Sequence, residues 1–266
     1  MNEDTRVAVC CYAGDQHQVI GALEFYLHHG CPLVILSPED SKAEITYPGV
    51  ENRFAGKRAY IGQDSLDRQR EHLKLLLTFS ENHFLIHDSD SVNLDAKIPD
   101  YLYEDPDVVW SNQVNDDIPE HQETLNRYGW ARVAFQPPYF LSRKTIEAML
   151  AVADDPRCKA TDMMPFIDYY MVQLTMCAGL RWARFKDSIS CPIAIDLQKI
   201  NPPAADLVTY SQGFKIAMGA VRNGGANILH SIKNPHAIRE LAEAHKLWLA
   251  ENPDKTPTPT RAPRVR

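Results

Sequence analysis

Short apolar runs alternate with amphipathic segments through the first third of the chain. Three such runs, each closed by polar or turn-forming residues, are predicted to be buried strands: residues 7–12, 32–36 and 83–86. Between them, apolar positions recur at helical spacing over residues 17–29, and again from a cap at Asp64 or Ser65 to residue 79. Strand, helix, strand, helix, strand is the order of parallel βαβ units. The pattern therefore predicts an α/β fold with a mostly parallel, Rossmann-like central sheet flanked by helices.

The rest of the chain is less regular. Residues 41–62 contain scattered glycine and proline and are predicted to be mostly loop, whereas residues 127–141 are predicted to be a loop and a short strand. A further strand is expected at residues 108–110, and a brief apolar stretch ends at His230. Helices are predicted over three segments, residues 142–152, 164–177 and 235–250, and the first of them is capped by Ser142. We expect one domain over residues 1–250, followed by a disordered Pro- and Arg-rich tail over residues 251–266.

Composition narrows the class of protein. With 266 residues, 44% hydrophobic and 24% charged, the chain is typical of a globular domain. Its net charge of −7 argues against a broad basic face for nucleic acid. No run of about 18 apolar residues is present, so no membrane span is expected. The polar start MNEDTR predicts no signal peptide, and six scattered cysteines suit buried free thiols, so a cytoplasmic location is expected.

The strongest chemical signal is the sequence Asp88-Ser89-Asp90, which directly follows the strand at residues 83–86. Ligands of parallel sheets bind at the carboxyl ends of the strands. In an extended segment Asp88 and Asp90 would point the same way, and two neighbouring carboxylates favour a divalent cation. A second such triplet, Asp105-Pro106-Asp107, precedes a strand and is predicted to be an exposed turn.

The chain resembles the GT-A glycosyltransferases, which carry an Asp-x-Asp motif after a central strand. The resemblance spans residues 7–233 and rests on the order of its segments: Ala13-Gly14-Asp15 after the first strand, FLIHDSDS at 84–91, YFLSRK at 139–144, Ile167-Asp168 ahead of Gly179, and LHSIK at 229–233. It implies a GT-A-like fold and a nucleoside-diphosphate sugar as donor.

The resemblance also implies roles for individual residues. Mn²⁺ or Mg²⁺ would be held by two carboxylates and an imidazole: Asp88, Asp90 and His230. Nucleotide and donor contacts are expected from Tyr12, Ala13, Gly14, Asp40, Arg68, Ser89 and Lys233. Arg70 is the alternative to Arg68 as the arginine that faces the diphosphate. Acceptor contacts are expected from Asn112, Gly129 and Trp130. The catalytic base would be Asp168, with Asp162 as the second candidate.

The implied activity is transfer of a hexose, with UDP-hexose as the expected donor, to an acceptor hydroxyl. An inverting mechanism is expected, although Ile167 stands where the family often has Glu, which leaves a retaining reaction open. The most specific acceptor is duplex DNA with hydroxymethylated bases, favoured by basic residues at 127, 132, 143, 144, 261, 264 and 266 and opposed by the net charge. A small molecule, a glycan or a protein stays open as acceptor. A sugar-phosphate nucleotidyltransferase and a non-catalytic nucleotide-sugar binding protein are the alternative functions.

Overall fold

The central sheet contains seven strands in a computed structural model of the chain. The strands are β1 (Thr5–Cys10), β2 (Leu33–Ser37), β3 (Val50–Phe54), β4 (His83–Asp88), β6 (Val108–Gln113), β7 (Ala134–Ser142) and β8 (Trp182–Arg184). Their order across the sheet is β3-β2-β1-β4-β7-β6-β8. The described residues are 4–16, 19, 26–27, 30–59, 61–89, 91–94, 101–104, 107–113, 134–159, 167–185, 188–190, 204–230 and 235–253.

All strands of this sheet except β7 run in the same direction. β1 pairs in parallel with both β2 and β4, and β2 pairs in parallel with β3. β7 is antiparallel to its neighbours β4 and β6, and β6 is parallel to β8. The prediction of a mostly parallel α/β sheet is therefore confirmed.

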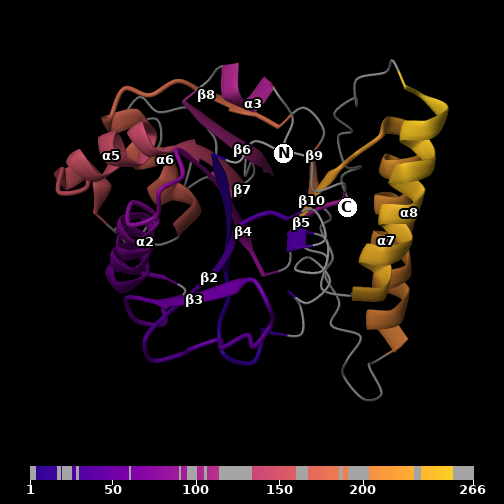
Figure 1. The fold of residues 1–266 in the computed structure, drawn as a ribbon, viewed down its shortest axis with the longest axis horizontal. Coiled ribbons are helices and arrows are strands. Elements are labelled where there is room, and N and C mark those ends of the chain that lie inside the picture. Colours follow the sequence, from indigo (N-terminus) through magenta and orange to yellow (C-terminus); the bar gives the residue numbers. More distant parts are fainter. Residues whose placement is uncertain are drawn as a thin grey trace.

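Helices cover both faces of the sheet (Figure 1). Side chains of a strand alternate between faces, so Val7 and Val9 of β1 lie on one face and Ala8 lies on the other. The first face packs against α7 (Ala204–Gly224) and α8 (Pro235–Glu251). The second face packs against α2 (Gln63–Leu76), α5 (Arg143–Ala151) and α6 (Ile167–Cys177). These two apolar layers are the core of the domain.

A second sheet of three short strands lies beside the first. It consists of β5 (Val92–Asn93), β10 (Ile228–His230) and β9 (Ser188–Ser190), with β10 in the middle. β10 is antiparallel to β5 and parallel to β9. Two short helical segments, α3 (Tyr101–Glu104) and η1 (Pro156–Cys158), complete the described elements. Among the described residues, no helix has the length and apolar character needed to cross a membrane.

Several predicted boundaries need correction. The segment predicted as mostly loop at residues 41–62 contains β3, an edge strand whose side chains are half-buried or exposed and so carry no apolar run. β7 is nine residues long and spans both prolines. Its pairing with β6 shifts register between Trp110 and Ser111, which leaves Pro137 and Pro138 out of the ladder, as suits residues at a bulge.

The helix starts differ in how well they were predicted. The cap of α2 is Gly62, not Asp64 or Ser65. Ser142 caps α5 as predicted, because its hydroxyl accepts a hydrogen bond from the backbone N–H of Thr145. The described residues of the helix predicted at 17–29 are helical, and the helix expected at 164–177 is described from residue 167. The tail boundary at residue 251 stays a prediction, because residues 254–266 lie outside the described residues.

Candidate active site

The last residues of three adjacent parallel strands meet at one edge of the sheet. We call this region the carboxyl edge and define it by residues 10–14 after β1, 37–41 after β2, and 88 and 89 at the end of β4. Cys10 is the register partner of Asp88. The backbone N–H of Ala13 donates to the carbonyl and the hydroxyl of Ser41, at 3.1 and 3.2 Å, which joins the loops after β1 and β2. The carboxyl edge thus contains Tyr12, Ala13, Gly14, Asp40, Asp88 and Ser89.

Arg68 is directed to this edge from the second turn of α2. Its side chain is buried, and its guanidinium carbon lies 5.1 Å from the ring centroid of Tyr12. The guanidinium also donates a hydrogen bond to the carbonyl of Ala59. Within the described part of the chain no carboxylate forms an ion pair with Arg68. A buried cation normally requires an anionic partner, so this position suits an anionic ligand.

Arg70, the alternative to Arg68, faces a different part of the molecule. Its guanidinium donates two hydrogen bonds to the carboxylate of Asp154 in a bidentate contact, at 2.8 and 3.1 Å. Of the two arginines, the structure directs Arg68 towards the carboxyl edge.

The pKa values of two groups near the carboxyl edge, Cys10 and His72, are shifted by burial and by nearby charges. Burial raises the pKa of the Cys10 thiol to about 12, and the Asp88 carboxylate acts in the same direction while Arg68 acts against it. Burial also lowers the pKa of His72 to about 3, with the Arg68 guanidinium as the next cause. Cys10 and His72 are therefore neutral at physiological pH. The charged groups around them are Asp88 and Arg68.

The chain turns directly after Asp88. The backbone N–H of Ser91 donates to the carbonyl of Asp88 at 3.1 Å, and the Ser91 hydroxyl accepts from the N–H of Asp88 at 3.0 Å. The expectation of an extended segment after Asp88 therefore does not hold for Ser89, which lies in this turn, while Asp90 is outside the described residues. His87 points into the core, where it contacts the Tyr26 hydroxyl at 2.5 Å. That contact and the Ser91 turn hold the end of β4 in place.

The third predicted metal ligand comes from a distant part of the sequence. β10 pairs with β5 so that Leu229 is opposite Val92 and Ile228 is opposite Asn93. Continuing this antiparallel register by one residue sets the backbone of His230 opposite Ser91, three residues after Asp88. The fold thus brings the His230 segment to the end of β4.

The metal site itself is only partly within the described residues. Asp90 and the side chain of His230 lie outside them, and among those that are described no three His, Cys, Asp or Glu side chains form a metal-binding group. The donor set of two carboxylates and one imidazole fits Mg²⁺ or Mn²⁺, and the β5–β10 pairing is compatible with it. Metal binding stays a prediction.

The start of α6 packs against α2, the helix that carries Arg68. The side-chain amide of Gln69 contacts the Met171 sulfur at 3.7 Å, one turn from the beginning of the helix. Asp168 is in that first turn, although its side chain is not described. Asn112 lies near the carboxyl end of β6, again with only its backbone described. The other predicted site residues lie outside the described residues: Asp162, Gly129, Trp130 and Lys233.

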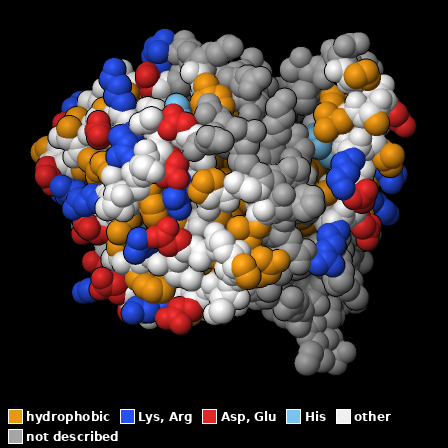
Figure 2. Space-filling view, viewed as in Figure 1, with side chains coloured by type: hydrophobic (Ala, Val, Ile, Leu, Met, Phe, Trp, Pro, Cys, Tyr) orange, Lys and Arg blue, Asp and Glu red, His pale blue; other side chains and the backbone are white. Residues whose placement is uncertain are grey.

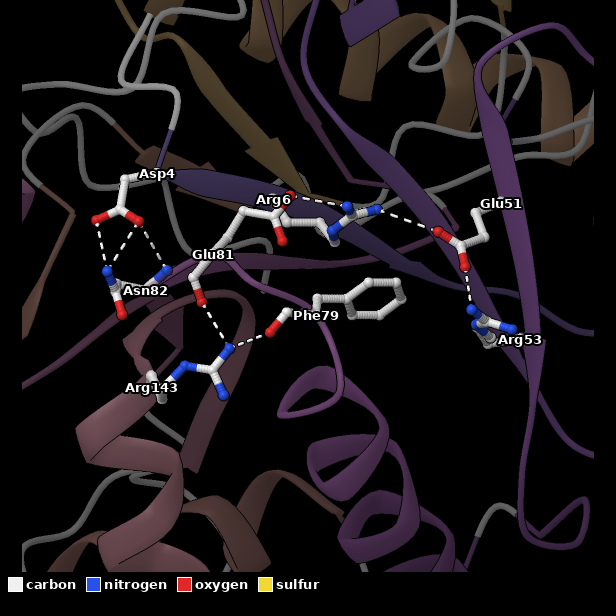
Figure 3. A network of polar contacts seen from close by, with 8 residues as sticks. All are labelled: Asp4, Arg6, Glu51, Arg53, Phe79, Glu81, Asn82 and Arg143. Carbon is white, nitrogen blue, oxygen red and sulfur yellow. Dashed lines mark hydrogen bonds and ion pairs between the residues drawn. The ribbon is translucent and has the colours of Figure 1, made fainter.

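Arg143 does not belong to an acceptor surface, contrary to its predicted place in a basic acceptor region. β7 runs antiparallel and ends opposite His83, the first residue of β4, so Arg143 lies at the other edge of the sheet. There its guanidinium donates to the carbonyl of Leu77 at 2.8 Å. It also donates to the carbonyls of Phe79 and Glu81, as Figure 3 shows. Arg143 is thus a structural residue that ties α5 to the chain before β4.

One arginine beside the carboxyl edge was missed by the sequence prediction. Arg58 follows β3, and its guanidinium carbon lies 5.3 Å from the ring centroid of Tyr12. Its backbone N–H donates to a carboxylate oxygen of Asp40 at 2.7 Å. Arg58 was missed because β3 was not predicted as a strand, so nothing indicated that Arg58 follows a strand end.

Comparisons with known proteins give structural matches only. No protein-family model matches the sequence, and no curated protein matches it at a significant level. A structure of the glycosyltransferase GlyE from Streptococcus pneumoniae TIGR4 aligns with a TM-score of 0.46 and 12% identity, covering 97% of this chain and 66% of that one. A structure of the galactosyltransferase LgtC, in complex with donor and acceptor sugar analogs, aligns with a TM-score of 0.48 and 10% identity, covering 90% and 95%. Similarity of this degree carries no functional conclusion.

Proposed function

We propose that the protein is a metal-dependent glycosyltransferase that moves a sugar from a nucleoside-diphosphate sugar to an acceptor hydroxyl. The observation that carries the proposal is that the carboxyl edge holds two kinds of group. One is a buried arginine, Arg68, that has no acidic partner among the described residues, and the other is the carboxylate of Asp88, the first residue of the Asp-Ser-Asp sequence. A diphosphate with a divalent cation needs both kinds of group. Arg68 would meet phosphate oxygens, and Asp88 would face the cation.

The roles of the remaining residues follow from this arrangement. Asp88, Asp90 and His230 would hold Mg²⁺ or Mn²⁺, which when bound supplies positive charge beside the two donor phosphates. Lys233 would add a further charge to the phosphates. Tyr12 and the loop after it would contact the nucleoside.

A nucleoside-diphosphate sugar, with UDP-hexose as the first choice, explains these groups better than a free nucleotide. The buried Arg68 and a metal held by Asp88, Asp90 and His230 would together offset the charge that develops on a leaving diphosphate, which is what sugar transfer requires. A nucleotidyltransferase would release pyrophosphate instead, and a binding protein would release nothing, so the product of the reaction separates these alternatives.

The test of the metal site is calorimetric titration of UDP into the protein with Mn²⁺ and with EDTA. We expect Asp90→Ala and His230→Ala to abolish the Mn²⁺-dependent part of the affinity while the far-UV circular dichroism stays unchanged. Asp107→Ala is the matched control, because it removes an acid of the second Asp-x-Asp triplet, which binds the backbone of Arg181 away from the carboxyl edge. Undiminished Mn²⁺-dependent UDP binding by the Asp90 variant would overturn the metal assignment.

We propose Asp168 as the catalytic base of an inverting reaction. An amide of the same shape cannot accept the acceptor proton, so Asp168→Asn should lose about 10²–10⁴-fold in transfer rate while nucleotide affinity stays within a few-fold. Asp162→Asn should lose little activity. The opposite result would exchange the two roles, and full activity of both variants would favour a retaining reaction.

The acceptor is proposed only as a compound with a hydroxyl group. The most specific candidate is duplex DNA with hydroxymethylated bases. Arg143 no longer supports this candidate, because its guanidinium is bound to backbone carbonyls. In Figure 2 the described basic and acidic side chains are interspersed on the visible face. Transfer of radiolabelled glucose from UDP-glucose to hydroxymethylated duplex DNA, to simple sugars and to peptides would decide. If glucose is transferred to another acceptor but not to the DNA, the proposal of a DNA acceptor would be refuted.

A further inference from the structure

Arg58 contacts three residues of the carboxyl edge. Its backbone N–H donates to Asp40 at 2.7 Å, and its guanidinium lies 3.5 Å from the Ser41 hydroxyl. The same guanidinium lies over the ring of Tyr12, with 5.3 Å from its carbon to the ring centroid. The segment that carries Arg58 is itself tied to β2, because Glu39 donates through its N–H to the carbonyl of Gly56 at 2.9 Å. Arg58 is therefore held in place by the loops after β1 and β2.

The two arginines on Tyr12 differ in depth and surroundings. Arg68 is buried, and its charge acts with that of Asp88 on the Cys10 thiol, at the end of the edge where the diphosphate and the cation are proposed to bind. Arg58 is exposed and is held by the loop after β2, farther from β4. A nucleoside diphosphate that places its phosphates at Arg68 would extend its base towards the outer side of Tyr12. That places Arg58 beside the base.

We propose that Arg58 is a specificity residue that recognises a nucleobase by its carbonyl groups, and that Asp40 is the positioning residue that holds it. The proposal rests on the proposed nucleoside-diphosphate sugar donor. A guanidinium has five N–H donors in a planar fork and no acceptor. It therefore binds the carbonyl oxygens of uracil, thymine or guanine, whereas the amino group of cytosine or adenine at the equivalent position presents a donor to a donor. The ligand class is thus a keto-base nucleoside diphosphate.

Asp40 has a structural contact besides the nucleotide contact expected from the sequence. One of its carboxylate oxygens accepts the backbone N–H of Arg58, and the nucleotide contact stays a prediction. An amide oxygen could make the same contact, and a methyl group could not. Asp40→Asn should therefore keep Arg58 in place, while Asp40→Ala should release it.

The experiment compares the affinities of UDP and CDP, and of GDP and ADP, by calorimetry with Mn²⁺ present. A charge-assisted hydrogen bond to a base carbonyl typically contributes about tenfold or more in affinity, so the wild-type protein should bind UDP about tenfold more tightly than CDP. In Arg58→Ala that ratio should fall to within about twofold. Arg58→Lys should keep most of the affinity and part of the ratio, because an ammonium is also a cation with donors only but lacks the planar fork of a guanidinium.

Three further variants make the result specific. Lys57→Ala removes the neighbouring exposed cation and should leave the UDP/CDP ratio unchanged. Arg68→Ala should weaken all nucleotides together and leave the ratio intact. Asp40→Ala should lower the ratio as Arg58→Ala does, and Asp40→Asn should preserve it.

The possible failures are distinguishable. Nucleotide binding by the wild type with an unchanged UDP/CDP ratio in Arg58→Ala would overturn this inference and leave the proposed function standing. A wild-type preference for CDP and ADP would also overturn it. If the wild-type protein bound no nucleotide with Mn²⁺, the proposed function would fail and the inference with it. Thermal melting by circular dichroism establishes that each variant is folded.

Discussion

Gly56 packs directly against the backbone of Arg68, and replacing it with alanine is the most direct test of how that arginine is held. Gly56 has φ +72°, a conformation that side-chain-bearing residues rarely adopt. A Cβ atom there would lie 2.8 Å from the Cα of Arg68 and 3.0 Å from its Cβ and Cγ. Cα belongs to the backbone of α2 and cannot move away as the end of a flexible side chain could.

Two separate costs are therefore expected for Gly56→Ala. The left-handed backbone conformation costs about 1–2 kcal/mol for an alanine. Crowding against a fixed backbone atom typically costs about 1–3 kcal/mol more. The free energy of unfolding should thus fall by about 2–5 kcal/mol, measured by urea denaturation followed by circular dichroism.

Gly30→Ala is the matched control. Gly30 has φ +68°, but nothing lies within 4 Å of a Cβ added there. It should carry the conformational cost alone, about 1–2 kcal/mol. The difference between the two variants isolates the contact with Arg68. If Gly56→Ala proves no less stable than Gly30→Ala, the close packing of Gly56 on Arg68 is refuted.

The same pair of variants tests whether Gly56 serves the site. Displacement of Arg68 should weaken Mn²⁺-dependent UDP binding in Gly56→Ala by about tenfold, the effect of roughly one charge-assisted hydrogen bond. Gly30→Ala should bind UDP as the wild type does. A Gly56 variant that loses stability but binds UDP normally would show that the packing is structural and does not position Arg68 for a ligand.

Three other predictions concern stability. Burial on its own raises the pKa of Glu81, but the hydrogen bond from Arg6, at 2.7 Å, helps to hold that pKa below its usual value. The stabilisation is therefore present above the unfolded pKa and is lost as the pH falls through the lower folded pKa. Glu81→Gln should cost about 1.5–3 kcal/mol at pH 7 and much less in strong acid, as urea titrations at both pH values would show. Tyr26→Phe should cost about 1–3 kcal/mol in calorimetry by removing the buried hydroxyl that contacts His87, and no loss would refute that contact. Ser142→Ala should cost about 1 kcal/mol by removing the cap of α5, whereas Ser142→Asp should restore most of it.

The elements that the sequence predicted well are those buried on both sides. All five residues of β2 are buried, so its apolar run is uninterrupted. β3 is at the edge of the sheet and has no such run. α7 was missed for another reason: its described buried positions include Ala217 and Ala220, small residues that let α7 and α8 pack closely and leave no stripe of large apolar side chains.

The candidate site was predictable only as far as its residues follow parallel strands. Asp88 ends β4 and Tyr12 comes two residues after the end of β1, the parallel neighbour of β4, so a strand assignment was enough to bring them together. The pairing of β5 with β10 cannot be derived from the apolar pattern of two short strands more than 100 residues apart, and it was the family resemblance that connected His230 with Asp88.

Strand direction explains why Arg143 lies on the other side of the sheet from the candidate site. The apolar pattern of β7 is the same whether the strand runs parallel or antiparallel to β4. If it ran parallel, Arg143 would follow β7 at the carboxyl edge, beside Asp88. Because it runs antiparallel, Ser142 is opposite His83, and Arg143 meets the carbonyls before β4 instead. A basic residue that comes after a strand therefore supports a ligand site only once the direction of that strand is known. By that criterion Arg58, which follows a strand parallel to β2, counts towards the site, and Arg143 does not.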